Sequence, residues 1–115
     1  MAYNPPMTKA AKVFTSGLAV VDFIFELDQF PAAPQKYIAE RGSCMSGGPA
    51  VNAAIAVTRL GGQAALGARV GADLLGALAL EELAAAAVDT AQVHRAPQGV
   101  TAFSAVYLDL SLIHI

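Results

Sequence analysis

The stretch from Gly47 to Gly71, GGPAVNAAIAVTRLGGQAALGARVG, decides the expected fold. It predicts a helix over residues 48–60, because Pro49 falls in the first turn and Gly61 directly follows the last apolar residue. Residues 64–70 form a short apolar run bounded by glycines, which is typical of a buried strand. A helix followed so closely by a buried strand indicates an α/β unit.

The flanking sequence extends this pattern in both directions. Asp73 can cap a second helix that runs to about Val88. We expect four leucines on the buried face of that helix: Leu74, Leu78, Leu80 and Leu83. Runs rich in β-branched and aromatic residues, or bounded by turn residues, predict further extended segments at residues 12–17, 20–27, 36–45 and 99–108. The order favours a layered α/β fold with a mainly parallel sheet, and the two strands around the proline-containing loop 29–34 suggest a small lid.

The two ends of the chain differ from this pattern. We interpret residues 1–11 as a loose leader, because Pro5 and Pro6 lie among small and polar residues without the apolar core of a signal peptide. Residues 12–109 then form the domain segment. Residues 110–115, LSLIHI, match the translation of the transposon mosaic end CTGTCTCTTATACACATC. We therefore interpret them as a non-native tail and the reading frame as truncated.

Composition and charge exclude several classes of function. A length of 115 residues allows one domain or part of one. With 9 acidic and 7 basic residues, the chain has no basic surface for nucleic acid or anionic membranes. The longest uncharged run, residues 42–58, is too polar and too short to cross a bilayer. One cysteine, Cys44, cannot form an internal disulfide, so we expect a cytoplasmic protein. Cysteine and histidine occur only at positions 44, 94 and 114, so we expect no structural zinc site.

The start of the first predicted helix carries the clearest chemical signal. Gly47 and Gly48 let the backbone turn sharply and approach a ligand closely. The positive end of the helix dipole favours an oxygen-rich ligand there. Asn52 is the one strongly polar side chain in the first turns of this helix, and its amide both donates and accepts hydrogen bonds. From spacing alone, a sugar-like ligand and a simple tight turn explain these residues equally well.

The run from Gly47 to Gly71 resembles the N-terminal signature of the ribokinase-like (PfkB family) carbohydrate kinases. The matching positions include the glycine pair, Asn52, Ala54 and Gly61. Upstream, the segment from Gly17 to Asp22 resembles the first strand of that family and the aspartate that follows it. The resemblance implies the N-terminal part of a ribokinase-like layered α/β fold with a small β lid, truncated.

Carried over by position, the resemblance implies a sugar-binding site. Asp22 would accept hydrogen bonds from sugar hydroxyls, the Gly47–Gly48 backbone would border the sugar, and Asn52 would bond it from the helix. On its own, Asp22 would more simply be a solvated carboxylate at a strand end. Val20 and Pro49 stand where ribokinases often carry asparagine and lysine, so ribose itself is in doubt as the substrate.

The resemblance also implies what this sequence does not contain. In the family, the catalytic aspartate, the glycine-rich anion hole and the ATP pocket lie in a later part of the chain, around a Gly-Ala-Gly-Asp motif that is absent here. We therefore expect no catalytic residue in this chain. ATP and Mg²⁺ would serve the full-length parent and bind this chain weakly or not at all. The parent would be an ATP-dependent sugar kinase, whose lid strands could pair in a homodimer. The alternative is a short, non-catalytic α/β module that binds a small polar ligand or a partner.

Overall fold

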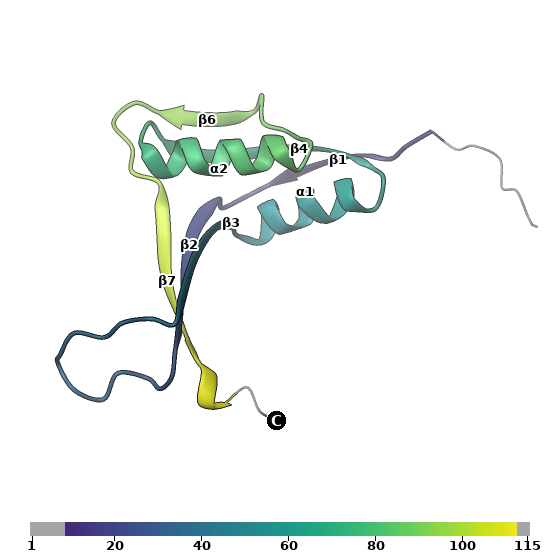
Figure 1. Ribbon diagram of the computed structural model, residues 1–115. Coiled ribbons are helices and arrows are strands. Elements are labelled where there is room, and N and C mark those ends of the chain that lie inside the picture. The colour runs from purple at the N-terminus through teal and green to yellow at the C-terminus, as the bar shows by residue number, and fades with distance from the viewer. Residues whose placement is uncertain (1–8, 113–115) are drawn as a thin grey trace, which may run out of the picture.

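The computed structural model describes residues 9–112 and consists of a small α/β core and a projecting lid (Figure 1). Its strands and helices are, in chain order, β1 (Lys12–Ser16), β2 (Val20–Leu27), β3 (Arg41–Gly47), α1 (Pro49–Arg59), β4 (Gln63–Gly71), α2 (Leu74–Ala85), β5 (Val88–Asp89), β6 (Val93–Ala96) and β7 (Ala102–Asp109). A short 3₁₀ turn, Leu110–Leu112, follows β7. Residues 1–8 of the expected leader and residues 113–115 of the expected tail lie outside the described residues.

The core is a parallel sheet built around β4. β1 pairs in parallel with β4, from Lys12 opposite Gln63 to Ser16 opposite Gly67. β5 pairs with the first half of β4, and β6 with its second half. Parallel pairing of strands joined by helices is the α/β arrangement that the sequence predicts.

Both helices cover one face of this sheet. Val51 and Ala54 of α1 and Leu83 of α2 are buried against Leu66 and Val70 of β4. Successive side chains of a strand point to opposite faces. The alternate residues of β4 therefore form a second face, which no helix of the described residues covers.

The lid is a separate three-stranded sheet in the order β3-β2-β7. β2 is central; it pairs antiparallel with β3 and in parallel with β7. In Figure 1 these strands leave the core together and end in the loop that joins β2 to β3. The two predicted early strands thus form the expected lid, and β7 completes it.

Two predicted boundaries in the lid need correction. The sequence predicts extended structure over residues 36–45, but β3 spans Arg41–Gly47. The β2–β3 pairing ends at Glu26 opposite Arg41, and the preceding loop is instead held by the Tyr37 hydroxyl, which bonds the backbone of Ala32 and Ala33. β7 begins at Ala102 rather than Gly99, because the backbone of Thr101 bonds the Asp73 side chain instead of a strand.

The second helix also differs from its prediction. Asp73 caps it as expected, accepting a hydrogen bond from the Gly76 amide. α2 ends at Ala85 rather than Val88, because Ala87 adopts a positive φ of 61° and turns the chain into β5. Leu74 is 82% exposed, since the buried stripe runs through Gly76, Ala79 and Leu83 and Leu74 lies about 200° around the helix from Gly76.

Two short strands escape the sequence analysis. β5 and β6 contain only two and four residues, and β6 is a mixture of polar and apolar residues. They are strands because β4 supplies their hydrogen-bonding partner. His94 therefore lies in a strand, opposite Arg69 of β4. Within residues 9–112, neither helix is long and apolar enough to cross a membrane.

Candidate functional site

Asp22 lies at the centre of the lid. It is on the middle strand β2, opposite Met45 of β3 and Ser104 of β7. The Ser104 hydroxyl donates a hydrogen bond of 2.6 Å to Asp22 Oδ1. The carboxylate is half-buried. One of its two oxygens is thus held by the neighbouring strand.

Gly47 lies beside the other oxygen of the same carboxylate. A Cβ atom built on Gly47 would collide with Asp22 Oδ2 and come within 3.6 Å of Val20 Cγ2. A residue with a side chain would have to displace the carboxylate. The absence of a side chain at position 47 therefore allows β3 and the Asp22 side chain to meet.

Gly48 makes the turn from β3 into α1. Its φ of 103° is in the region that favours glycine, and a Cβ there would collide with the Leu18 carbonyl oxygen. It is the N-cap residue of α1, and no side chain caps that end of the helix. The bend therefore brings the start of α1 close to the base of the lid.

Asn52 lies on the exposed side of α1. It lines a groove of about 1090 Å³ between α1, α2 and the edge strand β3, together with Met45, Ser46 and Glu82. Asp22 does not line this groove. Among residues 9–112, the Asn52 side chain has no hydrogen-bond partner. The structure thus brings Asp22, Gly47 and Gly48 together and leaves Asn52 on the neighbouring groove.

Glu82 connects α2 to the same strand. Its Oε2 atom accepts a hydrogen bond from the backbone amide of Ser46, the residue before Gly47. Ser46 is buried. Because β3 is an edge strand, this amide has no further strand to bond. Glu82 therefore holds the residue that directly precedes the turn made by Gly47 and Gly48, which we call the glycine bend.

Asp73 and Thr101 connect the core to the first residues of β7. Asp73 Oδ1 accepts from the Gly76 amide at 2.8 Å and from the Thr101 hydroxyl at 2.6 Å, and Oδ2 accepts from the Thr101 amide at 2.8 Å. The Thr101 hydroxyl in turn accepts from the Gly71 amide at 2.9 Å. The hydrogen bonds from the Thr101 side chain and backbone, with that from Gly76, lower the pKa of Asp73.

Sequence reasoning missed Ser104, Thr101 and Glu82. A β-strand serine and a threonine before a strand are common, and neither residue lies near its partner in the sequence. The only signal for them in the sequence is that the carboxylates of Asp22 and of the capping Asp73 need hydrogen-bond donors.

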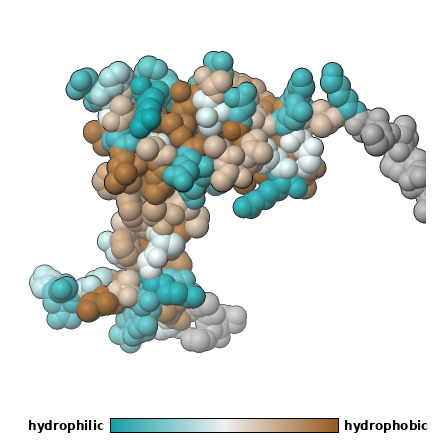
Figure 2. Space-filling view, turned by 45° about the horizontal axis from the view of Figure 1, so that its top comes forward, coloured by the Kyte–Doolittle hydropathy of each residue, from teal (hydrophilic) through white to brown (hydrophobic). Residues whose placement is uncertain are grey.

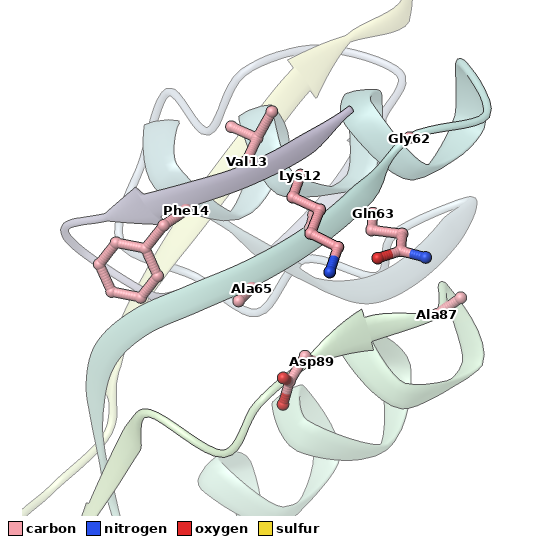
Figure 3. A pocket seen from close by; sticks show the side chains of 9 residues that line it. Lys12, Val13, Phe14, Gly62, Gln63, Ala65, Ala87 and Asp89 are labelled. Carbon is pink, nitrogen blue, oxygen red and sulfur yellow. The ribbon is translucent and has the colours of Figure 1, made fainter. Parts of the chain in front are cut away.

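A second cavity lies at the opposite end of the core sheet. It has a volume of about 600 Å³ and is lined by Lys12, Phe14, Gln63 and Asp89 among others (Figure 3). Lys12 and Gln63 are the first residues of β1 and β4, and Asp89 belongs to the neighbouring β5. Ligands of open α/β sheets bind instead beyond the carboxyl ends of the strands. Within residues 9–112, no three or more His, Cys, Asp or Glu side chains gather as a metal site.

The core and lid together define an α/β protein of the ribokinase-like fold. The model of a family described as "pfkB family carbohydrate kinase" matches residues 10–110, and the chain belongs to this family. The resemblance seen in the sequence is thereby confirmed.

Solved structures agree with this assignment. A protein from Agrobacterium tumefaciens described as a candidate ribokinase is 31% identical, with a TM-score of 0.84, and the match covers 90% of this chain and 34% of that one. A ribokinase from Cryptococcus neoformans, solved with ADP, matches 90% of this chain and 32% of its own at 24% identity and a TM-score of 0.73. A ribokinase from Arabidopsis thaliana, solved with ribose and ATP, matches 87% and 33% at 24% identity and a TM-score of 0.75. This chain therefore spans about a third of each of these proteins.

Proposed function

We propose that this chain is the sugar-binding part of an ATP-dependent carbohydrate kinase, which transfers a phosphoryl group from ATP to a sugar hydroxyl in a longer parent protein. The observation that carries the proposal is the Asp22 carboxylate, held on the lid against the glycine bend at Gly47. An ionised carboxylate is a strong acceptor for hydroxyl donors. The ribose and ATP in the Arabidopsis ribokinase support the same substrate class.

The proposed contacts to the sugar come from the lid strands and from the start of α1. Asp22 accepts hydrogen bonds from sugar hydroxyls, and the Gly47–Gly48 backbone borders the sugar because no side chain stands in the way. Asn52 bonds the sugar from α1 after a rotation of its free side chain out of the neighbouring groove. Val20 lies two residues before Asp22 on the same lid face and gives the site an apolar wall.

The sequence lacks the Gly-Ala-Gly-Asp motif around which the carbohydrate kinases that it resembles build the anion hole for ATP. Mg²⁺ at kinase sites is bound by one or two carboxylates together with the phosphates of the nucleotide, so its site lies with that of ATP. We therefore assign the nucleotide, the metal and the catalytic base to other parts of the parent. ATP use and a single cysteine both fit a cytoplasmic protein.

We also propose that lids of two parent subunits pair. The lid face opposite Asp22 is rich in aromatic residues, of which Phe103 is 62% and Tyr107 51% exposed. Phe103 packs edge-on against Phe23, and Tyr107 stacks on Phe25. Hydrophobic side chains follow the lid between the core and its more hydrophilic far end (Figure 2). Concentration-dependent sedimentation that Phe103→Glu abolishes would support this pairing, and unchanged sedimentation would argue against it.

The sugar-binding proposal is tested by ligand-observed NMR on the 115-residue chain. Saturation transfer to D-ribose and D-fructose is measured for the wild type, for Asp22→Asn and for Asp28→Asn, a matched control in an exposed loop. We expect weak transfer to at least one sugar that Asp22→Asn abolishes and Asp28→Asn preserves. With ATP and Mg²⁺ present we expect no sugar phosphate by ³¹P NMR. Sugar binding that persists in Asp22→Asn contradicts the proposed sugar site. Formation of a sugar phosphate contradicts the assignment of the nucleotide, the metal and the catalytic base to other parts of the parent.

A further inference from the structure

Ser104 forms the closest polar contact to the central carboxylate of the lid. It lies on β7 directly across from Asp22 in the parallel pairing of β2 and β7. Its hydroxyl donates to Asp22 Oδ1 over 2.6 Å, the length of a charge-assisted O–H···O⁻ bond. Such bonds are about twice as strong as those between neutral groups.

The surroundings of this pair are mostly apolar. Alternate residues of a strand share a face, so the nearest neighbours of Asp22 and Ser104 on this face follow from the register. They are Val20, Ile24, Ser43, Met45, Gly47, Ala102 and Val106. Ser43 is the one polar side chain among these neighbours; it lies diagonally across from Asp22, opposite Ile24. Among the described residues, the side chain that bonds the Asp22 carboxylate is that of Ser104.

The two carboxylate oxygens meet different strands. Oδ1 is bonded to Ser104 on β7, and Oδ2 lies against Gly47 on β3. Rotation of the carboxylate away from the glycine bend would break the bond to Ser104. Oδ2 occupies the space that a side chain at position 47 would fill. The serine thus selects one side-chain rotamer of Asp22.

We propose that Ser104 is a positioning residue of the sugar site, which holds the Asp22 carboxylate ready for the sugar before it binds. This inference rests on the proposed function for its sugar, but its effect on Asp22 is a property of the sugar-free chain. Preorganised acceptors bind more tightly, because the ligand does not have to offset the loss of side-chain freedom. The hydroxyl gives its one hydrogen to Asp22, so toward a ligand it can only accept.

The test compares three variants with the wild-type chain. Ser104→Ala removes the hydroxyl, and Ser104→Thr keeps it on a side chain that suits a strand. Ser43→Ala is the matched control, because Ser43 is on the same lid face but pairs with Ile24. The primary readout is the χ1 rotamer population of Asp22, from three-bond couplings in the absence of sugar. The second readout is the affinity for D-ribose and D-fructose by NMR titration.

We expect one dominant Asp22 rotamer in the wild type, in Ser104→Thr and in Ser43→Ala, and averaged couplings in Ser104→Ala. Ser104→Ala should weaken the binding of any bound sugar about three- to tenfold, because the sugar must then offset the loss of freedom of one side chain. Unchanged Asp22 couplings in Ser104→Ala overturn the inference, even if sugar binding falls. If no sugar binds the wild type, the proposed function fails for this chain, while the couplings still decide the role of Ser104.

A measurement on the wild type guards against a variant that does not fold. A hydroxyl whose oxygen lies 2.6 Å from a carboxylate oxygen should exchange its hydrogen slowly enough for the resonance to be seen at low temperature. We expect a Ser104 hydroxyl resonance with a nuclear Overhauser contact to the β-protons of Asp22. A Ser104 hydroxyl that exchanges as fast as that of Ser43 overturns the inference without any substitution.

Discussion

Asp73 and Thr101 are joined by two hydrogen bonds, one from the threonine hydroxyl and one from its backbone amide, although 28 residues separate them. Asp73 caps the core helix α2, and Thr101 directly precedes the lid strand β7. The same hydroxyl accepts the Gly71 amide at the end of β4. One buried side chain thus ties the end of the core sheet, the start of a helix and the base of the lid.

The first prediction concerns Thr101→Val. Valine has nearly the same shape but lacks the hydroxyl, so the buried Gly71 amide loses its acceptor and Asp73 loses a donor. Thr101 is 1% exposed, and water cannot replace the hydroxyl there. We expect a loss of about 1–3 kcal/mol in the free energy of unfolding, measured by urea denaturation. Thr90→Val, a threonine outside this cluster, should change it by less than about 0.5 kcal/mol. Equal effects would show that the cluster adds no stability.

The second prediction concerns acid stability. Hydrogen bonds from Thr101 and Gly76 place the pKa of Asp73 in the folded chain below its ordinary value. The unfolded chain therefore binds the proton more readily, and the stability from ionised Asp73 is present above about pH 4 and lost as pH falls through the folded pKa.

Asp73→Asn tests this dependence, because asparagine can cap the helix but does not titrate. We expect the stability difference between wild type and Asp73→Asn to be largest near neutral pH and to shrink below about pH 4. Thermal unfolding between pH 2.5 and 7 measures it. Asp28→Asn changes the charge equally in an exposed loop and should give no comparable dependence. A difference that grows as pH falls would contradict the assignment.

Local sequence signals predicted the helices and strands that have a clear capping residue, turn residue or composition. Pro49 and Gly61 bracket α1, Asp73 caps α2, and a run of β-branched and aromatic residues marks β2. β6 could not be predicted, because its four residues become a strand only when β4 pairs with them. The prediction that Leu74 is buried was wrong, because the side of α2 that meets the core carries Gly76, Ala79 and Leu83. Two of these three residues are small, so the pattern of large apolar side chains does not reveal this side.

The candidate site was predictable only where its residues carry a local signal in the sequence. Gly47 and Gly48 stand out locally, since a tight bend requires glycine wherever it occurs in a chain. Ser104 is 82 residues from Asp22, and the register of a parallel pair formed by distant segments is not written in either strand. The orientation of Asn52 depends on the rotation of α1 against β4, which small differences in the packing of Val51 and Ala54 set.

The third prediction concerns Gly47→Ala. The added Cβ would collide with Asp22 Oδ2 and lie 3.2 Å from Asp22 Cγ, so the carboxylate or the strand must move. We expect a loss of about 1–3 kcal/mol in the free energy of unfolding, as for other overpacked sites. Gly42→Ala on the same strand is the control, because its Cβ would meet its nearest atom, the Ile24 carbonyl oxygen, at an ordinary 3.9 Å.

A double-mutant cycle identifies the colliding group. In an Asp22→Ala background the carboxylate is absent, so Gly47→Ala should cost less than in the wild type, and the two changes should couple by at least about 0.5 kcal/mol. Strict additivity in urea denaturation would mean that Asp22 and Gly47 do not meet. Retained sugar binding in Gly47→Ala would show that the bend does not need to be free of side chains.

The fourth prediction separates two adjacent glutamates on α2. Glu82 accepts the buried Ser46 amide at the start of the glycine bend, whereas Glu81 is exposed and has no such bond among the described residues. Glu82→Ala leaves that amide without an acceptor, so we expect a loss of about 1–2 kcal/mol in the free energy of unfolding. Glu81→Ala removes the same charge one position earlier and should cost less than about 0.5 kcal/mol.

Hydrogen exchange gives the local readout of the same prediction. The Ser46 amide should exchange at least about tenfold faster in Glu82→Ala and at the wild-type rate in Glu81→Ala, since local opening sets the exchange rate. Equal protection of the Ser46 amide in all three proteins would show that α2 does not hold the bend, and the position of Gly47 would then depend on the lid strands alone.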